Sequence, residues 1–101
     1  MFQKINLSSI LYLQADDDYS ICFTKEGTFR SHLRLRELED LLERHFFFRV
    51  HRSYFVNLRN ATSVDLEKCQ INFSGCRIPF SRRVKSSLKQ QLLNLQIKFT
   101  F

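Results

Sequence analysis

A short polar connection between two apolar runs carries the side chains best suited to recognition chemistry. The connection consists of His51, Arg52 and Ser53, and it separates the runs at residues 46–50 and 54–58. Both runs are rich in aromatic and β-branched residues, which is typical of half-buried strands. An imidazole, a guanidinium and a hydroxyl between two strands form a compact set of hydrogen-bond donors on a rigid scaffold. The pattern indicates a ligand-binding connection, with ordinary solvated side chains as the alternative.

A second group of donors lies in the C-terminal quarter of the chain. Arg82, Arg83 and Lys85 follow Ser81, and apolar residues then recur at helical spacing. Ser81 is therefore predicted to be the N-cap of a C-terminal helix. A helix N-terminus presents free N–H groups and a partial positive charge, so these four residues are predicted to form a phosphate-binding corner, called the basic corner below. A solvated helix start is the alternative.

Three consecutive carboxylates, Asp16, Asp17 and Asp18, precede Tyr19 and mark a turn. Clustered carboxylates suit hard cations, but three consecutive residues on an extended path cannot all point at one ion, so we expect an acidic turn and no metal. A carboxylate repels phosphate, yet it accepts a hydrogen bond from the amino group of cytosine. This turn therefore contributes to base recognition only where basic neighbours hold the nucleic-acid backbone, and the basic corner and the His51-Arg52 connection are the expected neighbours.

The elements that position these residues are mostly strands. Alternating apolar residues predict a meander over residues 10–14, 19–24 and 28–33, with turns at residues 16–18 and 25–27. A central helix is predicted over residues 35–44, with its leucines toward the core, because four of them recur at helical spacing: Leu35, Leu38, Leu41 and Leu42. Strands at residues 46–50, 54–58 and 62–66 and a final hairpin then precede the C-terminal helix.

The register of the final hairpin follows from the residues alone. Ser74 and Gly75 are predicted to form its tip. Apolar side chains then meet across the two strands in the pairs Phe73 with Cys76, Ile71 with Ile78, and Cys69 with Phe80. This register separates Cys69 from Cys76 and argues against a disulfide between them.

Charge is distributed unevenly along a chain whose length predicts one domain. The 101 residues include 44% hydrophobic residues, two Gly and one Pro, which predicts a folded domain over residues 1–101 rather than disorder. Residues 1–48 contain six basic and eight acidic residues, a net charge of −2, whereas residues 49–101 contain ten basic and two acidic residues, a net charge of +8. Such asymmetry is typical of proteins that bind nucleic acid or an anionic membrane. A soluble basic protein without such a partner is the alternative.

No pattern indicates catalysis, a cofactor or a metal. The sequence lacks a G-x-S-x-G motif, and its two glycines leave no Gly-rich phosphate loop. Cys22, Cys69 and Cys76 form no C-x-x-C pair and are predicted to be small core hydrophobes, and the three histidines lack metal-ligand spacing. No apolar run has the length of a membrane span, and the N-terminus lacks a secretory signal. We therefore expect a cytoplasmic protein that is not an enzyme, uses no cofactor and binds no membrane.

Three motifs follow one another in a specific order. They are FRVHRSYFVN at residues 48–57, the leucine pattern of residues 35–42 before it, and IPFSRR-x-K at residues 78–85 after it. In this order and spacing they closely resemble the LytTR family of bacterial DNA-binding domains, of the LytR/AlgR type, and the resemblance covers nearly the whole chain. Residues 10–15, with Asp18 and Tyr19, resemble two strands of that family and their turn.

The resemblance implies a mostly β fold of small packed antiparallel sheets with few helices. It also implies an output module of a response regulator in a two-component system, binding double-stranded DNA as two copies on direct repeats through successive major grooves. Loops and strand ends make the base contacts. Carried onto this sequence, the DNA-binding residues are Asp18 or Tyr19 in the acidic turn, His51, Arg52 and Ser53 in the central connection, and Arg82, Arg83 and Lys85 at the basic corner.

Most members of the family carry a phosphoacceptor receiver domain upstream, and 101 residues leave no room for one. We therefore expect a free-standing regulator or an excised output domain, with any sensor kinase or receiver domain outside this chain. Two other hypotheses stay open. One is a protein-interaction or homodimerisation module with a basic face, and the other is RNA binding.

Overall fold

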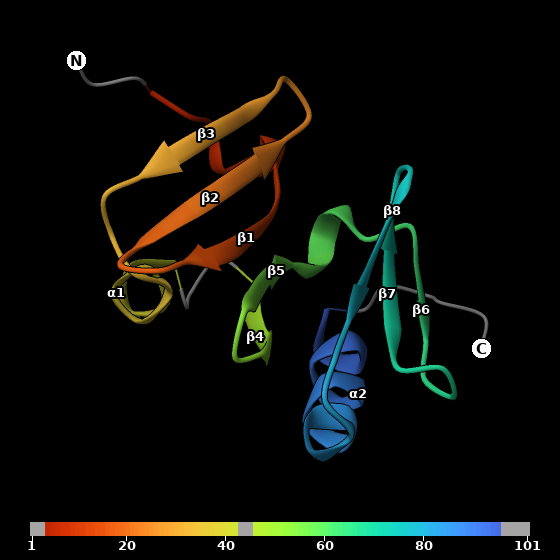
Figure 1. The fold of residues 1–101 in the computed structure, drawn as a ribbon. Helices are drawn as coiled ribbons and strands as arrows, with labels where there is room; N and C mark the ends of the chain where they lie inside the picture. The colour runs from red at the N-terminus through yellow and green to blue at the C-terminus, as the bar shows by residue number, and fades with distance from the viewer. Residues whose placement is uncertain (1–3, 43–45, 96–101) are drawn as a thin grey trace.

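The computed structural model describes residues 4–42 and 46–95, which form two antiparallel sheets and two α-helices (Figure 1). The five-stranded sheet has the strand order β3-β2-β1-β5-β4, and the three-stranded sheet has the order β6-β7-β8. Within the described ranges, no helix is long and apolar enough to cross a membrane. The elements are η1 Leu7–Ser9, β1 Ile10–Asp16, β2 Tyr19–Thr24, β3 Thr28–Ser31, α1 Leu35–Leu42, β4 Phe47–His51, β5 Tyr54–Asn57, η3 Leu58–Asn60, β6 Ser63–Asp65, β7 Gln70–Phe73, β8 Cys76–Pro79, η4 Arg82–Val84 and α2 Lys85–Asn94.

The predicted meander is confirmed. Strand β2 pairs antiparallel with β1 on one side and with β3 on the other. Asp17 and Asp18 form the tip of the first hairpin, because Asp16 pairs with Tyr19. Asp17 has a φ of 52°, a left-handed conformation that a tight hairpin turn requires and that Asp tolerates better than most residues.

The hairpin β4–β5 joins this sheet through β5, which pairs antiparallel with β1. Its pairing contains a β-bulge, because Arg49 faces Phe55 and His51 faces Tyr54, leaving Val50 as an extra residue in β4. A bulge bends its strand and leaves main-chain groups outside the ladder. Arg52 and Ser53 then form the turn between the two strands.

Helix α1 packs on one face of the five-stranded sheet. Its residues Leu35, Leu38 and Leu42 are buried in a cluster with apolar residues of that sheet, among them Leu13 and Phe55. Leu41 was expected to face the core as well, and that prediction is wrong because its side chain is 64% exposed. An eight-residue helix on a sheet buries one stripe, and Leu41 lies outside the stripe formed by its three neighbours. The predicted helix end at residues 43–44 lies outside the described residues.

The other face of the five-stranded sheet contacts the second sheet. A second buried cluster brings together Tyr12 and Val56 of the first sheet, Ile71 and Ile78 of the second, and Leu88 of α2. The predicted final hairpin is confirmed for two of its three pairs, Phe73 with Cys76 and Ile71 with Ile78. The third predicted pair, Cys69 with Phe80, lies beyond both strands, where the Phe80 N–H donates to the Cys69 carbonyl at 3.0 Å. Successive residues of a strand point to opposite faces, so β1 supplies Tyr12 to this cluster and Leu13 to the cluster under α1.

The start of the C-terminal helix differs from the prediction. Arg82–Val84 form a turn of 3-10 helix, and α2 begins only at Lys85. Ser81 has an extended backbone conformation, but its side chain makes no capping hydrogen bond. The reason is that the Val84 N–H, the donor that a capping hydroxyl would bind, donates instead to the Ser81 carbonyl at 3.1 Å.

The cysteines are only partly as expected. Cys22 is buried, whereas Cys69 and Cys76 are half-buried, and all three are free thiols. The prediction of a core position is therefore confirmed for Cys22 alone. Burial raises the pKa of the Cys22 thiol to about 11, because an apolar environment disfavours the thiolate.

Candidate nucleic-acid interface

The turn between β4 and β5 presents the residues of the central polar connection. His51 ends β4 and is half-buried, and Arg52 at the tip of the turn is exposed. The His51 ring lies 5.7 Å from the ring of Tyr54, measured between centroids. The short hairpin therefore holds His51 against the first residue of β5 and leaves the Arg52 side chain toward solvent.

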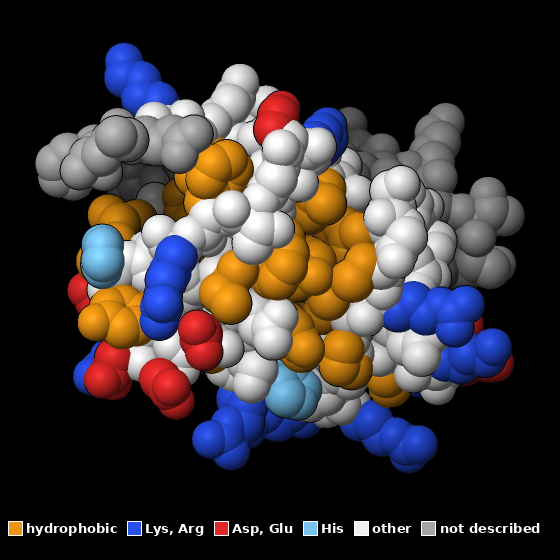
Figure 2. All heavy atoms as spheres, turned by 45° about the horizontal axis from the view of Figure 1, so that its top comes forward, with side chains coloured by type: hydrophobic (Ala, Val, Ile, Leu, Met, Phe, Trp, Pro, Cys, Tyr) orange, Lys and Arg blue, Asp and Glu red, His pale blue; other side chains and the backbone are white. Residues whose placement is uncertain are grey.

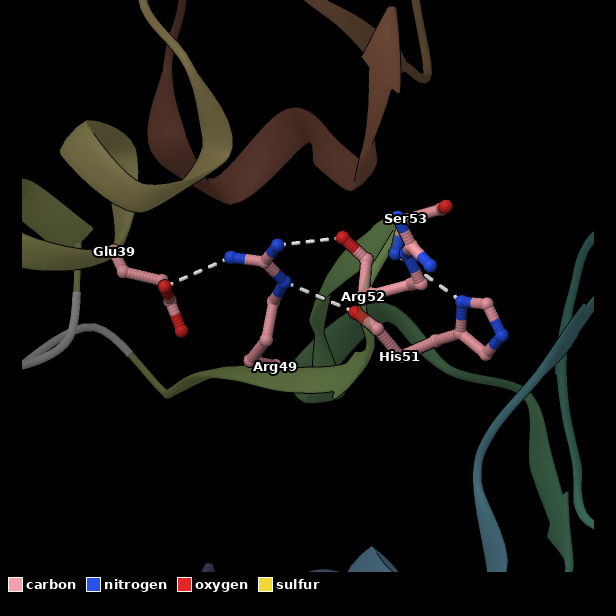
Figure 3. A network of polar contacts seen from close by, with 5 residues as sticks. All are labelled: Glu39, Arg49, His51, Arg52 and Ser53. Atoms are coloured by element: carbon pink, nitrogen blue, oxygen red, sulfur yellow. Dashed lines mark hydrogen bonds and ion pairs between the residues drawn. The ribbon is translucent and has the colours of Figure 1, made fainter.

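The main chain of this turn selects one tautomer of His51. The Ser53 N–H donates to His51 Nδ1 at 3.1 Å (Figure 3). An imidazole nitrogen that accepts a hydrogen bond carries no proton, so the neutral ring holds its proton on Nε2. His51 therefore offers an N–H donor, which suits the acceptor atoms of a guanine edge or a phosphate oxygen.

Arg49 connects this turn to helix α1 (Figure 3). Its Nη1 donates to Glu39 Oε2 at 2.8 Å, its Nε donates to the His51 carbonyl at 2.9 Å, and its Nη2 donates to the Arg52 carbonyl at 2.5 Å. All three guanidinium nitrogens are therefore bonded within the protein. The sequence indicates this bonding role of Arg49 by placing a charged residue within an apolar strand that follows a helix with an acidic side.

The basic corner is bonded directly to β4. The Ser81 N–H donates to the Val50 carbonyl at 3.0 Å. Val50 is the extra residue of the bulge, so its carbonyl lies at the irregular point of the β4–β5 ladder. Arg82, Arg83 and Lys85 follow this bond, and all three are exposed.

The end of β1, which leads into the acidic turn, is bonded to the same hairpin. The Ala15 N–H, one residue before the acidic turn, donates to the Ser53 carbonyl at 2.9 Å. Two main-chain hydrogen bonds, Ala15 to Ser53 and Ser81 to Val50, thus connect the three predicted segments through the β4–β5 hairpin.

The carboxylates of the acidic turn have arginine partners that the sequence analysis missed. Asp18 Oδ1 accepts from Arg34 at 2.8 Å, and Asp16 lies 3.7 Å from Arg30. Both pairs are solvent-exposed, so they contribute little to stability, but they offset negative charge at this end of the molecule. The basic neighbours of this turn among the described residues thus include residues of β3 and of the loop after it, which were not among the expected ones. The sequence indicated these partners only through the short turn at residues 25–27, which brings β3 back beside β2.

Tyr19 lies among these charged groups. Its side chain is 38% exposed, the Arg30 guanidinium lies 4.7 Å from the ring centroid, and the His32 ring meets it edge-on at 5.6 Å. An exposed aromatic ring with a cation on its face provides both an apolar surface and a positive charge.

One face of the molecule has an apolar centre with charged side chains around it. Figure 2 shows Lys and Arg side chains along the margin of an orange patch on this face, with most of the visible Asp and Glu side chains at its lower left, near a histidine. Within the described part of the chain, no group of three or more His, Cys, Asp or Glu residues is arranged to hold a metal ion.

Residues 2–93 match the family model of the LytTr DNA-binding domain. The match spans nearly the whole chain, so this chain belongs to the LytTR family. It is a non-enzymatic DNA-binding domain homologous to transcriptional regulators, and the predicted fold class of mostly antiparallel sheets with two helices is confirmed.

Relatives and a solved structure agree with this assignment. The chain is 31% identical over 93 residues to the heme-containing CO-sensing transcriptional regulator RcoM 2 of Paraburkholderia xenovorans (strain LB400), and 29% identical to RcoM 1 of the same strain. Each match covers 87% of this chain and 35% of the regulator, so the chain spans about a third of their length. The LytTr DNA-binding domain of a Bacillus cereus protein described as a methyl-accepting/DNA response regulator superposes with a TM-score of 0.77 at 27% identity, covering 87% of this chain and 84% of that one.

Proposed function

We propose that residues 1–101 act as a single sequence-specific module that binds double-stranded DNA in a transcriptional regulator. Two copies would occupy direct repeats and read successive major grooves from loops and strand ends. The main observation in support is that the β4–β5 hairpin is hydrogen-bonded to Ala15, the residue before the acidic turn, and to Ser81 of the basic corner, by the bonds Ala15 to Ser53 and Ser81 to Val50. Main-chain bonds of this kind give the three segments a fixed spacing, which base recognition requires.

The proposed roles follow from exposure and bonding. Arg52 and Arg82 are exposed, and each forms no ion pair among the described residues, so their forked donors are proposed to pair with guanine O6 and N7. His51 is proposed to donate from Nε2, beside Ser53. Arg83 and Lys85 are proposed to bind phosphates, with the rise in affinity at low salt that such contacts give.

Tyr19 is the proposed contact in the acidic turn. The Asp18 carboxylate is bonded to Arg34, so we propose that Asp18 holds this arginine at the interface while the Tyr19 ring contacts DNA. Aromatic and apolar groups contact the thymine methyl or the sugar edge in such interfaces.

The input signal is proposed to come from outside these residues, from a sensor kinase, a receiver domain or another sensory partner in the cytoplasm. The relatives support two kinds of input, because one is described as a response regulator and two as CO-sensing heme proteins. These properties belong to those proteins, and this chain would supply the DNA-binding part.

Selection from random duplexes, followed by titration of the enriched duplex and a scrambled duplex at one salt concentration, tests this function. We expect enrichment of a repeated motif and preferential binding of its duplex. Equal affinity for both duplexes, or tighter binding of single-stranded RNA, contradicts the proposal. Size-exclusion mass without DNA tests the competing interaction module, since that module associates in the absence of nucleic acid.

A further inference from the structure

We propose that Arg49 is a positioning residue for DNA recognition, and that Glu39 of α1 orients it. In this proposal Arg49 contacts no DNA. It holds the main chain of the β4–β5 turn and thereby fixes where His51 and Arg52 point. The inference rests on the proposed function, because it concerns the specificity of the same interface.

The Arg49 guanidinium is held by hydrogen bonds within the protein. Its three guanidinium nitrogens reach three acceptors: the Glu39 carboxylate and the carbonyls of His51 and Arg52. The side chains of Arg49 and Glu39 are 28% and 33% exposed, so the pair is partly shielded from water. A charge-assisted bond to a carbonyl is shorter and stronger than a neutral one, and the rigid fork of arginine suits several acceptors at once.

The β4–β5 turn would be less ordered without Arg49. The bulge at Val50 interrupts the β4–β5 ladder immediately before His51, and a two-residue turn follows. Arg49 bonds the carbonyls of both residues that follow the bulge. Without these bonds, the two carbonyls would lose their charged donor, and the His51 and Arg52 side chains would sample more directions. Base readout loses discrimination when a reading side chain is imprecisely placed.

Positioning the turn requires arginine at position 49, because lysine has a different geometry. Lysine at position 49 keeps the positive charge and can still pair with Glu39. It is a single point charge on a flexible stem, so it cannot hold the carboxylate and both carbonyls in one plane. Arg49→Lys therefore keeps the positive charge and removes the set of hydrogen bonds that positions the turn.

The experiment measures the affinity of the full chain for the selected duplex and for a scrambled duplex over a range of salt concentrations, together with Tm. Arg49→Lys is expected to lower the ratio of the two affinities roughly tenfold, because charge-assisted bonds to the turn are lost. The salt slope stays unchanged, since Arg49 contacts no phosphate. Arg36→Lys, an exposed arginine of the same helix as Glu39, is the matched control and should leave the ratio unchanged.

Two further variants keep the test valid if Arg49→Lys is unstable. Glu39→Gln removes the ion pair but leaves the Arg49 bonds to the turn, so a smaller loss of the ratio is expected. The exchange Glu39→Arg with Arg49→Glu restores an ion pair between α1 and β4 but removes the donors to both carbonyls. We expect the exchange to recover Tm without recovering the ratio.

A purely structural role predicts a different result: Tm falls while both duplexes lose affinity by the same factor. That outcome, or a ratio unchanged in Arg49→Lys, overturns the proposal. A salt slope reduced by about one also overturns it, because it identifies Arg49 as a phosphate contact. Arg52→Ala is measured in parallel. If it lowers the ratio and Arg49→Lys does not, only this inference fails, whereas a wild-type chain without duplex preference removes the proposed function as well.

Discussion

The Ser81 N–H donates to the carbonyl of Val50 at 3.0 Å, and this bond joins the basic corner to the bulge of β4. The bulge explains why the carbonyl can accept from a distant segment, since the extra residue is left outside the regular ladder. A local irregularity of one strand thus provides the attachment point for the start of a helix 31 positions later in the chain. If this bond is lost, the basic corner loses its main-chain attachment to the β4–β5 hairpin.

Replacing Ser81 with proline tests this dependence. Proline lacks the N–H but accepts the Ser81 φ of −75°, so the substitution removes the bond to Val50 with little change of backbone conformation. We expect a loss of about 1–3 kcal/mol in the free energy of unfolding and weaker duplex binding. Ser81→Ala is the control, because the Ser81 side chain makes no capping bond, and it should change stability by less than about 0.5 kcal/mol. Equal losses in both variants, measured by urea unfolding, would show that the hydroxyl matters and the amide does not.

Base-reading and phosphate-binding residues are distinguished by their effects on specificity and on salt dependence. Arg52→Ala and Arg82→Ala should each lower discrimination between the selected duplex and one altered at the contacted base by about 1–3 kcal/mol. Lys85→Ala should weaken all duplexes similarly and reduce the salt slope by about 0.9. Gel-shift titration at several salt concentrations measures both quantities. Unchanged specificity in both arginine variants would remove the assignment of these two residues.

The leucines of α1 give a direct test of the packing. Leu38 is 9% exposed and Leu41 is 64% exposed, although both belong to the same leucine pattern. Leu38→Ala should cost about 2–5 kcal/mol of unfolding free energy because it leaves a cavity under the helix. Leu41→Ala should change it by less than about 0.5 kcal/mol. Thermal unfolding of the two variants side by side decides the matter, and comparable losses would contradict the described face of the helix.

The Cys22 thiol should react slowly with thiol reagents in the folded protein. Its pKa is raised to about 11 by burial, so little thiolate forms near neutral pH, whereas Cys69 and Cys76 are half-buried. Because the folded-state pKa lies above the ordinary value of about 9, the protonated thiol favours the folded state. This contribution is complete below about pH 9 and is lost as the pH rises toward 11. Two fast thiols and one slow thiol in a disulfide-exchange assay are expected. Three equal rates in folded protein would contradict the burial of Cys22.

Local sequence patterns predicted the strands, the helices and the final hairpin well. They did not predict contacts between residues that are far apart in the chain. Phe73 and Cys76 pair as expected because a two-residue turn and apolar alternation leave one register. The sequence shows that Asp18, Arg34, Arg49 and Glu39 are charged residues in or beside these elements, but which of them pair depends on how the elements pack. Ser81 failed as a side-chain cap because the tertiary bond to Val50 and the 3-10 turn after it decide the local hydrogen bonding.

The three tyrosines give this domain an intrinsic optical probe, because the chain contains no tryptophan whose emission would mask theirs. The buried Tyr12 has its hydroxyl 3.3 Å from the half-buried Cys76 sulfur and its ring 6.2 Å from that of Tyr54, whereas Tyr19 is partly exposed beside the acidic turn. Ultraviolet fluorescence of the unlabelled protein therefore reports on two places at once. Emission from the exposed Tyr19 ring should fall when a bound duplex covers it, and the buried Tyr12 ring should respond only when the two sheets separate.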